Sequence, residues 1–185
     1  MHSIINEMTE INFIPIIESQ VSSYELLFAH VLISPSPDDS LIEHFVEFML
    51  SKGVTDMFNF SHVISDMPYD HNVVVDNGIN FHSIYIPDGH TPSQNNLNTF
   101  NEIMNKILSN NINPTILFHC VAGLGRAPTM LAYLMMTRYS KKMEKEDIID
   151  FIRDNRYGSF NTKQIDWILN TKIKNKNKNS SCVIL

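Results

Sequence analysis

The sequence predicts an α/β fold: a single compact domain with a central, mainly parallel, four- to five-stranded sheet that helices flank. Three observations lead to this prediction. Short apolar runs alternate with longer amphipathic segments in the middle of the chain, the last third is helical in pattern, and 185 residues with 43% hydrophobic content are enough to bury one core. Strands that alternate with helices pair in parallel and are covered on both faces.

The chain begins with an arm and continues with strands. Residues 1–20 are polar and irregular, and we expect them to be loosely held. The run "YELLFAHVLISP" then predicts one or two strands, because its β-forming residues end at Pro35 and Pro37.

A helix is expected next, in "SLIEHFVEFMLSKG". Ser40 stands three residues before Glu43, which is the pattern of a capping box, and apolar residues recur along one helical face. Gly53 is expected to stop this helix.

Two more short strands are predicted in "VTDMFNF" and "INFHSIYIP". Between them, "VVVDNG" has two interpretations. Asn77-Gly78 is typical of a hairpin, whereas Gly78 is equally suited to end a helical turn. The residues alone leave both open.

The rest of the chain alternates once more and then becomes helical. "PSQNNLNTFNEIMNKILSN" predicts an amphipathic helix and "PTILF" a strand, and the last helix is expected to open at Asn161 and Gln164. Further helices are predicted in "PTMLAYLMMTRY" and "EKEDIIDFIRDNR". Because "KIKNKNKNSS" is too polar to pack, we expect a folded domain over residues 21–172 and a tail over 173–185.

The segment "HCVAGLGRAP" carries the chemistry. Cys120 is expected at the C-terminal end of a strand, where open α/β sheets bind ligands, with residues 121–125 as a loop to the next helix. Gly123 and Gly125 allow the backbone N–H groups to face inward as a nest for an anion, and the positive end of the helix points into the same hollow. The candidate phosphate-binding residues are therefore Val121, Ala122, Gly123, Leu124, Gly125 and Arg126.

Arg126 adds a planar cation suited to two phosphate oxygens, and the same positive field favours a thiolate at Cys120. A thiolate facing a bound phosphate predicts attack on phosphorus and a phosphocysteine that water then hydrolyses. The alternative is a buried core cysteine beside a turn. A metal site through His119 and Cys120 is not expected, because the domain has no second cysteine and no paired histidine spacing, and no cofactor is implied.

Such chemistry also needs a general acid. "YIPDGHTP" places Asp88 in a turn-prone loop after a predicted strand. The residues alone favour an ordinary turn aspartate over an acid, and His90 has a weaker claim than Asp88.

The extended segment around Cys120 closely resembles the active site of the phosphatases of regenerating liver, the type IVA protein tyrosine phosphatases. The resemblance continues through "EDIIDFIRDNRYGSFNTKQIDWI" and, more weakly, back through "PDGHTP", "GVTDMF" and "YELLF". It implies the cysteine phosphatase fold, with Cys120 as nucleophile, Arg126 as the phosphate-binding arginine and Asp88 as the general acid.

This chain departs from the family pattern in ways that bear on activity. Ala127 stands where many cysteine phosphatases carry a hydroxyl residue, so we expect slow breakdown of the phosphocysteine. Pro87 directly precedes Asp88, where the family usually has paired aspartates. Ser61 occupies the position of a second family cysteine that can pair with the nucleophile, so no intramolecular disulfide is expected within the domain.

The chain ends in "CVIL", the pattern that prenyl transferases read, with Cys182 as the acceptor and the final Leu favouring geranylgeranyl. One lipid combined with a polybasic segment is the arrangement that stable anchoring requires, and type IVA phosphatases are themselves prenylated. The basic residues of the tail are Lys172, Lys174, Lys176 and Lys178.

Composition and charge restrict the partners and the location. No signal peptide or membrane-spanning run is evident, and two cysteines cannot form a disulfide framework, so we expect a reducing compartment and a free thiol at Cys120. The formal charge of −6 combines an acidic body with a basic tail, which does not match a nucleic-acid-binding protein. We expect the cytoplasmic face of a membrane, or a soluble protein if the chain is not prenylated.

Three functions remain open from the sequence. The first is a prenylated protein tyrosine or dual-specificity phosphatase acting on phosphoproteins. The resemblance also implies a low-turnover binding module for a membrane magnesium transporter of the cyclin M type. The third is a phosphoinositide phosphatase, although "VAGLG" lacks a lysine for an inositol phosphate.

Overall fold

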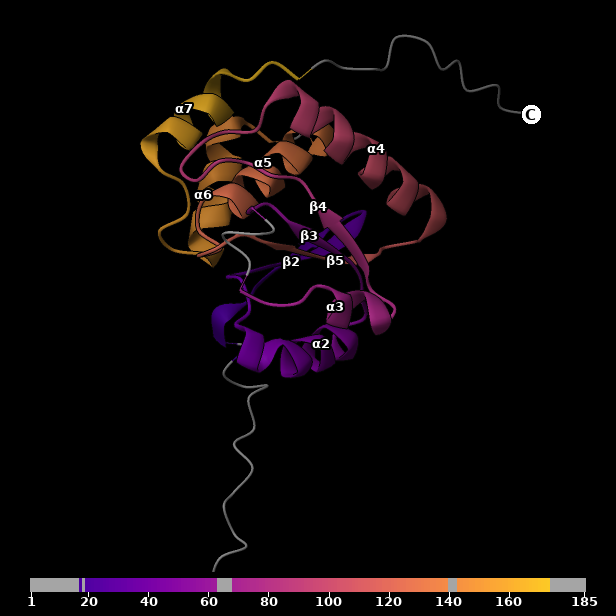
Figure 1. Ribbon diagram of the computed structural model, residues 1–185. Coiled ribbons are helices and arrows are strands. Elements are labelled where there is room, and N and C mark those ends of the chain that lie inside the picture. Colours follow the sequence, from indigo (N-terminus) through magenta and orange to yellow (C-terminus); the bar gives the residue numbers. More distant parts are fainter. Residues whose placement is uncertain (1–16, 18, 63–67, 140–142, 174–185) are drawn as a thin grey trace, which may run out of the picture.

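The structure, a computed structural model, describes residues 17, 19–62, 68–139 and 143–173 (Figure 1). Most of the predicted arm and tail therefore lies outside the described residues. Within the arm, Ile17 is buried against the core. The elements in chain order are β1 (Ser22–Leu26), β2 (Ala29–Ser34), the 3-10 turn η1 (Asp39–Leu41), α2 (Ile42–Ser51), β3 (Val54–Asn59), α3 (Asn72–Asp76), β4 (Asn80–Ser83), α4 (Gln94–Asn110), β5 (Thr115–His119), α5 (Arg126–Tyr139), α6 (Lys145–Asn155) and α7 (Thr162–Asn170).

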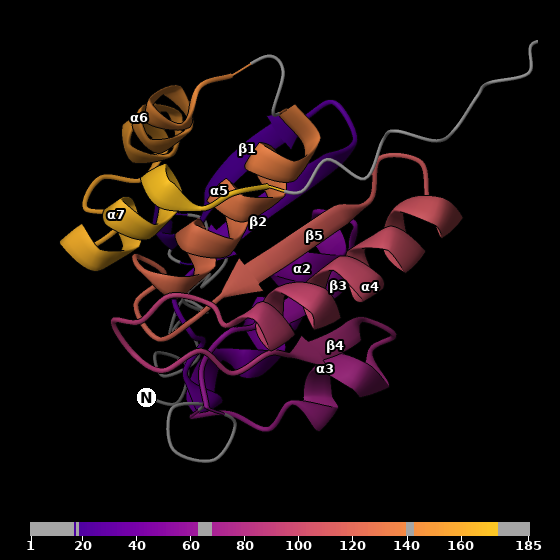
Figure 2. The same cartoon turned by 90° about the horizontal axis from the view of Figure 1, so that it is seen from above.

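A five-stranded sheet with the order β1-β2-β5-β3-β4 forms the centre of the domain. Strands β1 and β2 form an antiparallel hairpin, and every other pairing is parallel. Helices α4 to α7 cover one face of the sheet, while α2 and α3 cover the other (Figures 1 and 2). The prediction of a mainly parallel α/β sheet flanked by helices is confirmed.

Strand β5 lies in the middle of the sheet, and both of its faces are buried. Ile116 and Phe118 join the apolar cluster beneath α4 to α7, whereas Leu117 between them joins the cluster beneath α2 and α3. This alternation is what a strand between two cores requires, because successive side chains point to opposite faces. Cys120, the residue after β5, is therefore positioned by a strand that is packed on both faces.

The start of α2 differs from the prediction. The expected capping box between Ser40 and Glu43 is wrong: α2 begins at Ile42 and has no side-chain cap. Asp38 is the capping residue instead, since its carboxylate accepts hydrogen bonds from the Ser40 N–H (2.9 Å) and hydroxyl (2.6 Å) at the start of η1. An ionised carboxylate is a stronger hydrogen-bond acceptor than a serine hydroxyl. The Ser40 hydroxyl therefore donates to Asp38 and does not cap the helix itself.

The ambiguous segment before β4 is a helix. Residues Asn72–Asp76 form α3, and the chain leaves it through Gly78 with φ of 81°. The hairpin interpretation is wrong because β3 and β4 pair in parallel, so the chain must cross over the sheet between them.

Reciprocal capping boxes open α4 and α7. In α4 the pair is Ser93 and Asn96, which the sequence analysis does not predict. In α7 it is Asn161 and Gln164, the two residues with which the last helix is predicted to open. Among the described residues, no helix is long and apolar enough to cross a bilayer.

Candidate active site

Cys120 follows the last residue of β5, at the carboxyl end of the central strand, and its side chain is buried. Residues 121–125 then form a loop, and α5 begins at Arg126. This is the strand, loop and helix arrangement that the sequence predicts. Gly123 has φ of 68°, and a Cβ there would lie 2.4 Å from Ser34 O and 2.6 Å from Arg156 Nη2. A glycine is therefore required at this position.

All five loop carbonyls accept hydrogen bonds from groups outside the loop. The bonds run from Ser36 N to Val121 O (2.9 Å), from Arg156 Nη2 to Ala122 O (3.5 Å), from Arg156 Nε to Gly123 O (2.7 Å), from Phe160 N to Leu124 O (2.8 Å) and from Thr129 N to Gly125 O (3.0 Å). In a trans peptide the C=O and the following N–H point in opposite directions. The N–H groups of residues 122–126 thus point away from these donors.

Arg156, at the end of α6, supports the loop from behind. Besides the two loop carbonyls, its guanidinium donates to Ile33 O (3.3 Å) and Gln20 O (3.0 Å). Burial lowers the pKa of Arg156 below its ordinary value, and the nearby Tyr24 and Cys120 oppose that shift. No sequence motif predicts this role for Arg156, which lies only within the longer segment that resembles the type IVA phosphatases.

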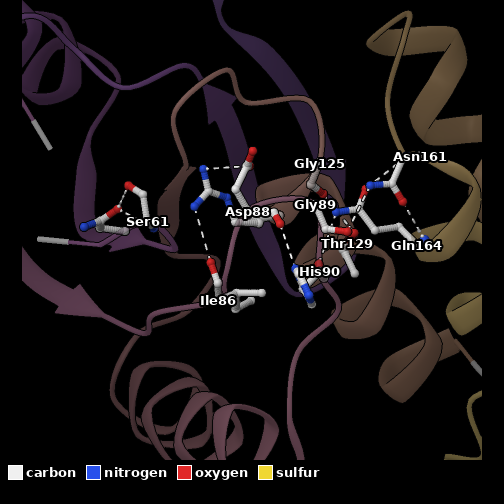
Figure 3. Close-up of polar contacts among 11 residues, drawn as sticks. Ser61, Ile86, Asp88, Gly89, His90, Gly125, Thr129, Asn161 and Gln164 are labelled. Atoms are coloured by element: carbon white, nitrogen blue, oxygen red, sulfur yellow. Dashed lines mark hydrogen bonds and ion pairs between the residues drawn. The ribbon is translucent and has the colours of Figure 1, made fainter. Parts of the chain in front are cut away.

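Arg126 lies in the hollow and contacts the Asp88 loop. Its Nη1 donates to Ile86 O at 3.3 Å, and its Nη2 lies 3.2 Å from Asp88 Oδ1 (Figure 3). The arginine side chain is only 3% exposed, whereas the aspartate side chain is 87% exposed. Asp88 therefore sits at the mouth of the hollow, above a buried cation.

A hollow of about 230 Å³ brings six of the predicted site residues together. Its lining consists of Asp88, Cys120, Val121, Ala122, Gly125 and Arg126. The other two predicted phosphate-binding residues are not among those that line it: Gly123 is buried, and the Leu124 side chain is exposed. Of the predicted tail residues, Lys172 follows α7 and is exposed, while Lys174, Lys176, Lys178 and Cys182 lie outside the described residues.

His119 lies behind Cys120 and is fully buried. Its Nε2 is 2.8 Å from the hydroxyl of Tyr69, a contact that no sequence motif indicates. Burial lowers the pKa of His119 to about 3, and the charge of Arg126 acts in the same direction. The ring is therefore neutral at physiological pH.

Among the described residues, no cluster of histidine, cysteine and carboxylate side chains could hold a metal ion.

Ser61 and Ala127 also have defined positions. Ser61 is buried two residues after β3, and its hydroxyl donates to Asn59 Oδ1 at 2.6 Å (Figure 3). Ala127 is buried in the first turn of α5. The nearest hydroxyl in that turn, on Thr129, donates to Gly125 O at 2.8 Å.

His90, the weaker candidate for the general acid, lies two residues after Asp88 and is exposed. Its Nδ1 lies 2.7 Å from the backbone oxygen of Asp88, within the same loop. Asp88 lines the hollow together with Arg126, and its role as general acid stays a prediction.

Similarity to known proteins extends over the segment that contains these site residues. A family model described as "Swiss Army Knife protein, DSP-PTPase phosphatase domain" matches residues 38–168. The "Protein tyrosine phosphatase PRL-1" of Leishmania major is 32% identical over 162 residues, covering 84% of this chain and 88% of that protein. The "Probable protein tyrosine phosphatase type IVA A" of Dictyostelium discoideum is 34% identical over 130 residues, covering 69% and 75%. A solved structure of a putative protein tyrosine phosphatase from Leishmania major superposes with a TM-score of 0.72 at 28% identity, covering 83% of this chain and 99% of that chain.

Proposed function

This chain belongs to the PRL, or type IVA, family of protein tyrosine phosphatases, and we propose that it hydrolyses phosphate monoesters of proteins through a phosphocysteine on Cys120. The observation that carries the proposal is the shared hollow. A thiol, a buried guanidinium and an exposed carboxylate line it, beside a loop whose carbonyls are all turned outward.

In the first step, the phosphate of the substrate binds to the loop N–H groups and to Arg126, which offers two donors to two oxygens. The sulfur of Cys120 attacks phosphorus as the thiolate, and the bond from phosphorus to the leaving oxygen breaks. Protonated Asp88, at the mouth of the hollow, gives its proton to that oxygen. The products are the free hydroxyl of the substrate and a phosphocysteine.

In the second step, water attacks the phosphocysteine. The carboxylate of Asp88 accepts a proton from the water, the bond from phosphorus to sulfur breaks, and the thiolate and inorganic phosphate are released. The departing sulfur needs a donor. Ala127 has none, and the Thr129 hydroxyl already donates to Gly125 O. We therefore expect this second step to limit turnover.

A burst experiment tests the proposal. Rapid mixing with p-nitrophenyl phosphate should release one equivalent of nitrophenol per site quickly, followed by slow turnover. Cys120→Ser should abolish the burst, and acid quenching should trap a phosphorylated peptide containing Cys120. If the burst persists in Cys120→Ser, or no phosphopeptide forms, the mechanism is wrong.

Ala127 also favours a second candidate, in which slow turnover accompanies a binding role. The partner implied by the family resemblance is a membrane magnesium transporter of the cyclin M type. A Cys120→Ala variant separates the two, because a binding module retains its partner affinity without the thiol. A phosphoinositide phosphatase has less support, since Arg126 is the cation among the described residues that line the hollow.

The tail is proposed to hold the enzyme at the cytoplasmic face of a membrane. A prenyl group on Cys182 and the lysines of the tail supply the two signals that stable anchoring needs. Each lysine near an anionic leaflet adds about 1 kcal/mol. This location would present the hollow to phosphoproteins at the membrane surface.

A further inference from the structure

The loop that carries Asp88 is held by side chains from the start of α7. The Nδ2 of Asn161 donates to Gly89 O at 3.1 Å, and the Nε2 of Gln164 donates to His90 O at 3.2 Å (Figure 3). These two carbonyls belong to the two residues that directly follow Asp88. We infer that Asn161 and Gln164 are positioning residues that hold Asp88 over the hollow, an inference that rests on the general-acid role proposed above.

The orientation of both amides is determined by the helix cap. Asn161 Oδ1 accepts from Gln164 N at 2.9 Å, and Gln164 Oε1 accepts from Asn161 N at 3.0 Å. Each side-chain oxygen is used to open α7, so each NH₂ group is left to face the Asp88 loop. The capping box thus has a second use, as a two-point latch.

Gln164 also contacts the phosphate-binding loop. Its side chain is buried, and a Cβ added at Gly125 would lie 3.0 Å from its Nε2. The amide therefore sits between the loop that binds the phosphate and the loop that carries the acid. It fixes the spacing between them.

The opposite end of the Asp88 loop has a matching contact. Asn96, in the capping box of α4, accepts from Ser93 N at 2.9 Å and donates to Tyr85 O at 3.1 Å. Two helix caps thus hold the loop on either side of Asp88. Among the described residues, the carboxylate itself contacts Arg126, at 3.2 Å, so its position depends on the backbone that the caps hold.

Positioning of an acid to within a fraction of an ångström matters, because a displacement of about 1 Å can cost about 10²-fold in rate. Asn161→Ser keeps an oxygen that caps α7 but removes the donor to Gly89 O. Losing such a bond should lower the population of the positioned loop about fivefold or more. Asn161→Asp, which replaces the donating NH₂ by an acceptor, should have the larger effect.

Single-turnover transfer to Cys120 should be measured with two substrates. Phenyl phosphate has a leaving group with a pKa of about 10, like tyrosine, and needs the acid. Dinitrophenyl phosphate has a leaving group that departs without a proton. For Asn161→Ser, transfer from phenyl phosphate should slow about five- to thirtyfold, while transfer from dinitrophenyl phosphate stays unchanged. Asn170→Ser is the matched control, because its amide in the same helix donates only to Asp166.

Asp88→Ala, measured in parallel, separates the latch from the mechanism. It should slow phenyl phosphate about 10²- to 10⁴-fold and spare dinitrophenyl phosphate. If Asp88→Ala shows this pattern and both Asn161 variants match the wild type, the latch is refuted and the general acid stands. Equal slowing of both substrates by the Asn161 variants also refutes it, since that marks general damage. If Asp88→Ala itself reacts normally, the general-acid role and the latch both fail.

Discussion

The buried ring of His119 makes the stability of the domain depend on pH. Burial, aided by the charge of Arg126, lowers the pKa of His119 to about 3 in the folded protein. In the unfolded chain the pKa returns to about 6.5. The unfolded state therefore binds more protons than the folded state between these two values. The stability that comes from the neutral ring is complete above pH 6.5 and is lost as the pH falls towards 3.

The size of the effect follows from the two pKa values. One pH unit inside this window corresponds to about 1.4 kcal/mol of unfolding free energy. Protonation of His119 in the unfolded chain should therefore lower the free energy of unfolding by about 2 kcal/mol between pH 7.5 and pH 5. His119→Gln should remove this part of the pH dependence. Every other titrating group is shared by the two proteins, so the difference between them isolates the histidine.

The assay is urea unfolding at both pH values, followed by the fluorescence of Trp167, the one tryptophan of the chain. Tyr69→Phe is the control, because it removes the hydroxyl beside Nε2 and leaves the ring able to titrate. It should lower the free energy of unfolding by about 1–3 kcal/mol at both pH values and keep the wild-type slope. If His119→Gln loses as much stability on acidification as the wild type, the ring is not a buried neutral group and the reasoning fails.

Further predictions concern the loop, the release step and the tail. Ala127→Ser should raise steady-state turnover about tenfold or more and leave the burst rate unchanged, because a hydroxyl near the departing sulfur aids only the second step; equal changes in both rates would contradict this. Gly123→Ala should abolish the burst and lower the melting temperature, since the left-handed backbone alone costs about 1–2 kcal/mol and the added carbon overlaps Ser34 O. Cys182→Ser should move the protein from the membrane to the soluble fraction of a cell lysate, and a mutant that stays bound would disprove the anchor. In a Cys182→Ser protein treated with peroxide, peptide mass mapping should find sulfenic or higher acids on Cys120 and no internal disulfide.

Local signals predicted the elements and the core of the site. Periodicity, turn residues and the glycines around Cys120 are short-range features, and they correctly placed the thiol at the end of a strand, followed by a loop over residues 121–125 that leads to a helix. The hairpin alternative at Gly78 could not be excluded in the same way. It depends on whether two strands pair in parallel, which is a property of the whole sheet.

Long-range contacts were not visible in the pattern of residues. Asp88 and Arg126 are far apart in the chain, so the residues alone favoured an ordinary turn aspartate, and only the family resemblance indicated otherwise. Arg156 donates to backbone carbonyls. Every residue has a carbonyl, so no residue type in the sequence marks the acceptors. Asn161 and Gln164 were predicted as a helix cap, but the use of their NH₂ groups depends on a loop elsewhere in the chain.

Apart from Thr129 N in α5, the donors to the loop carbonyls lie far from the loop in the chain. Ser36 follows β2, whereas Arg156 and Phe160 lie between α6 and α7. Contacts of such high sequence separation form late in folding, because the intervening chain must first be ordered. A nascent or partly unfolded chain would thus carry an ordinary cysteine without an anion site. The reactive centre is assembled only when these distant donors are in place, so a chain truncated before Arg156 should be inert towards phosphate esters even where its sheet has formed.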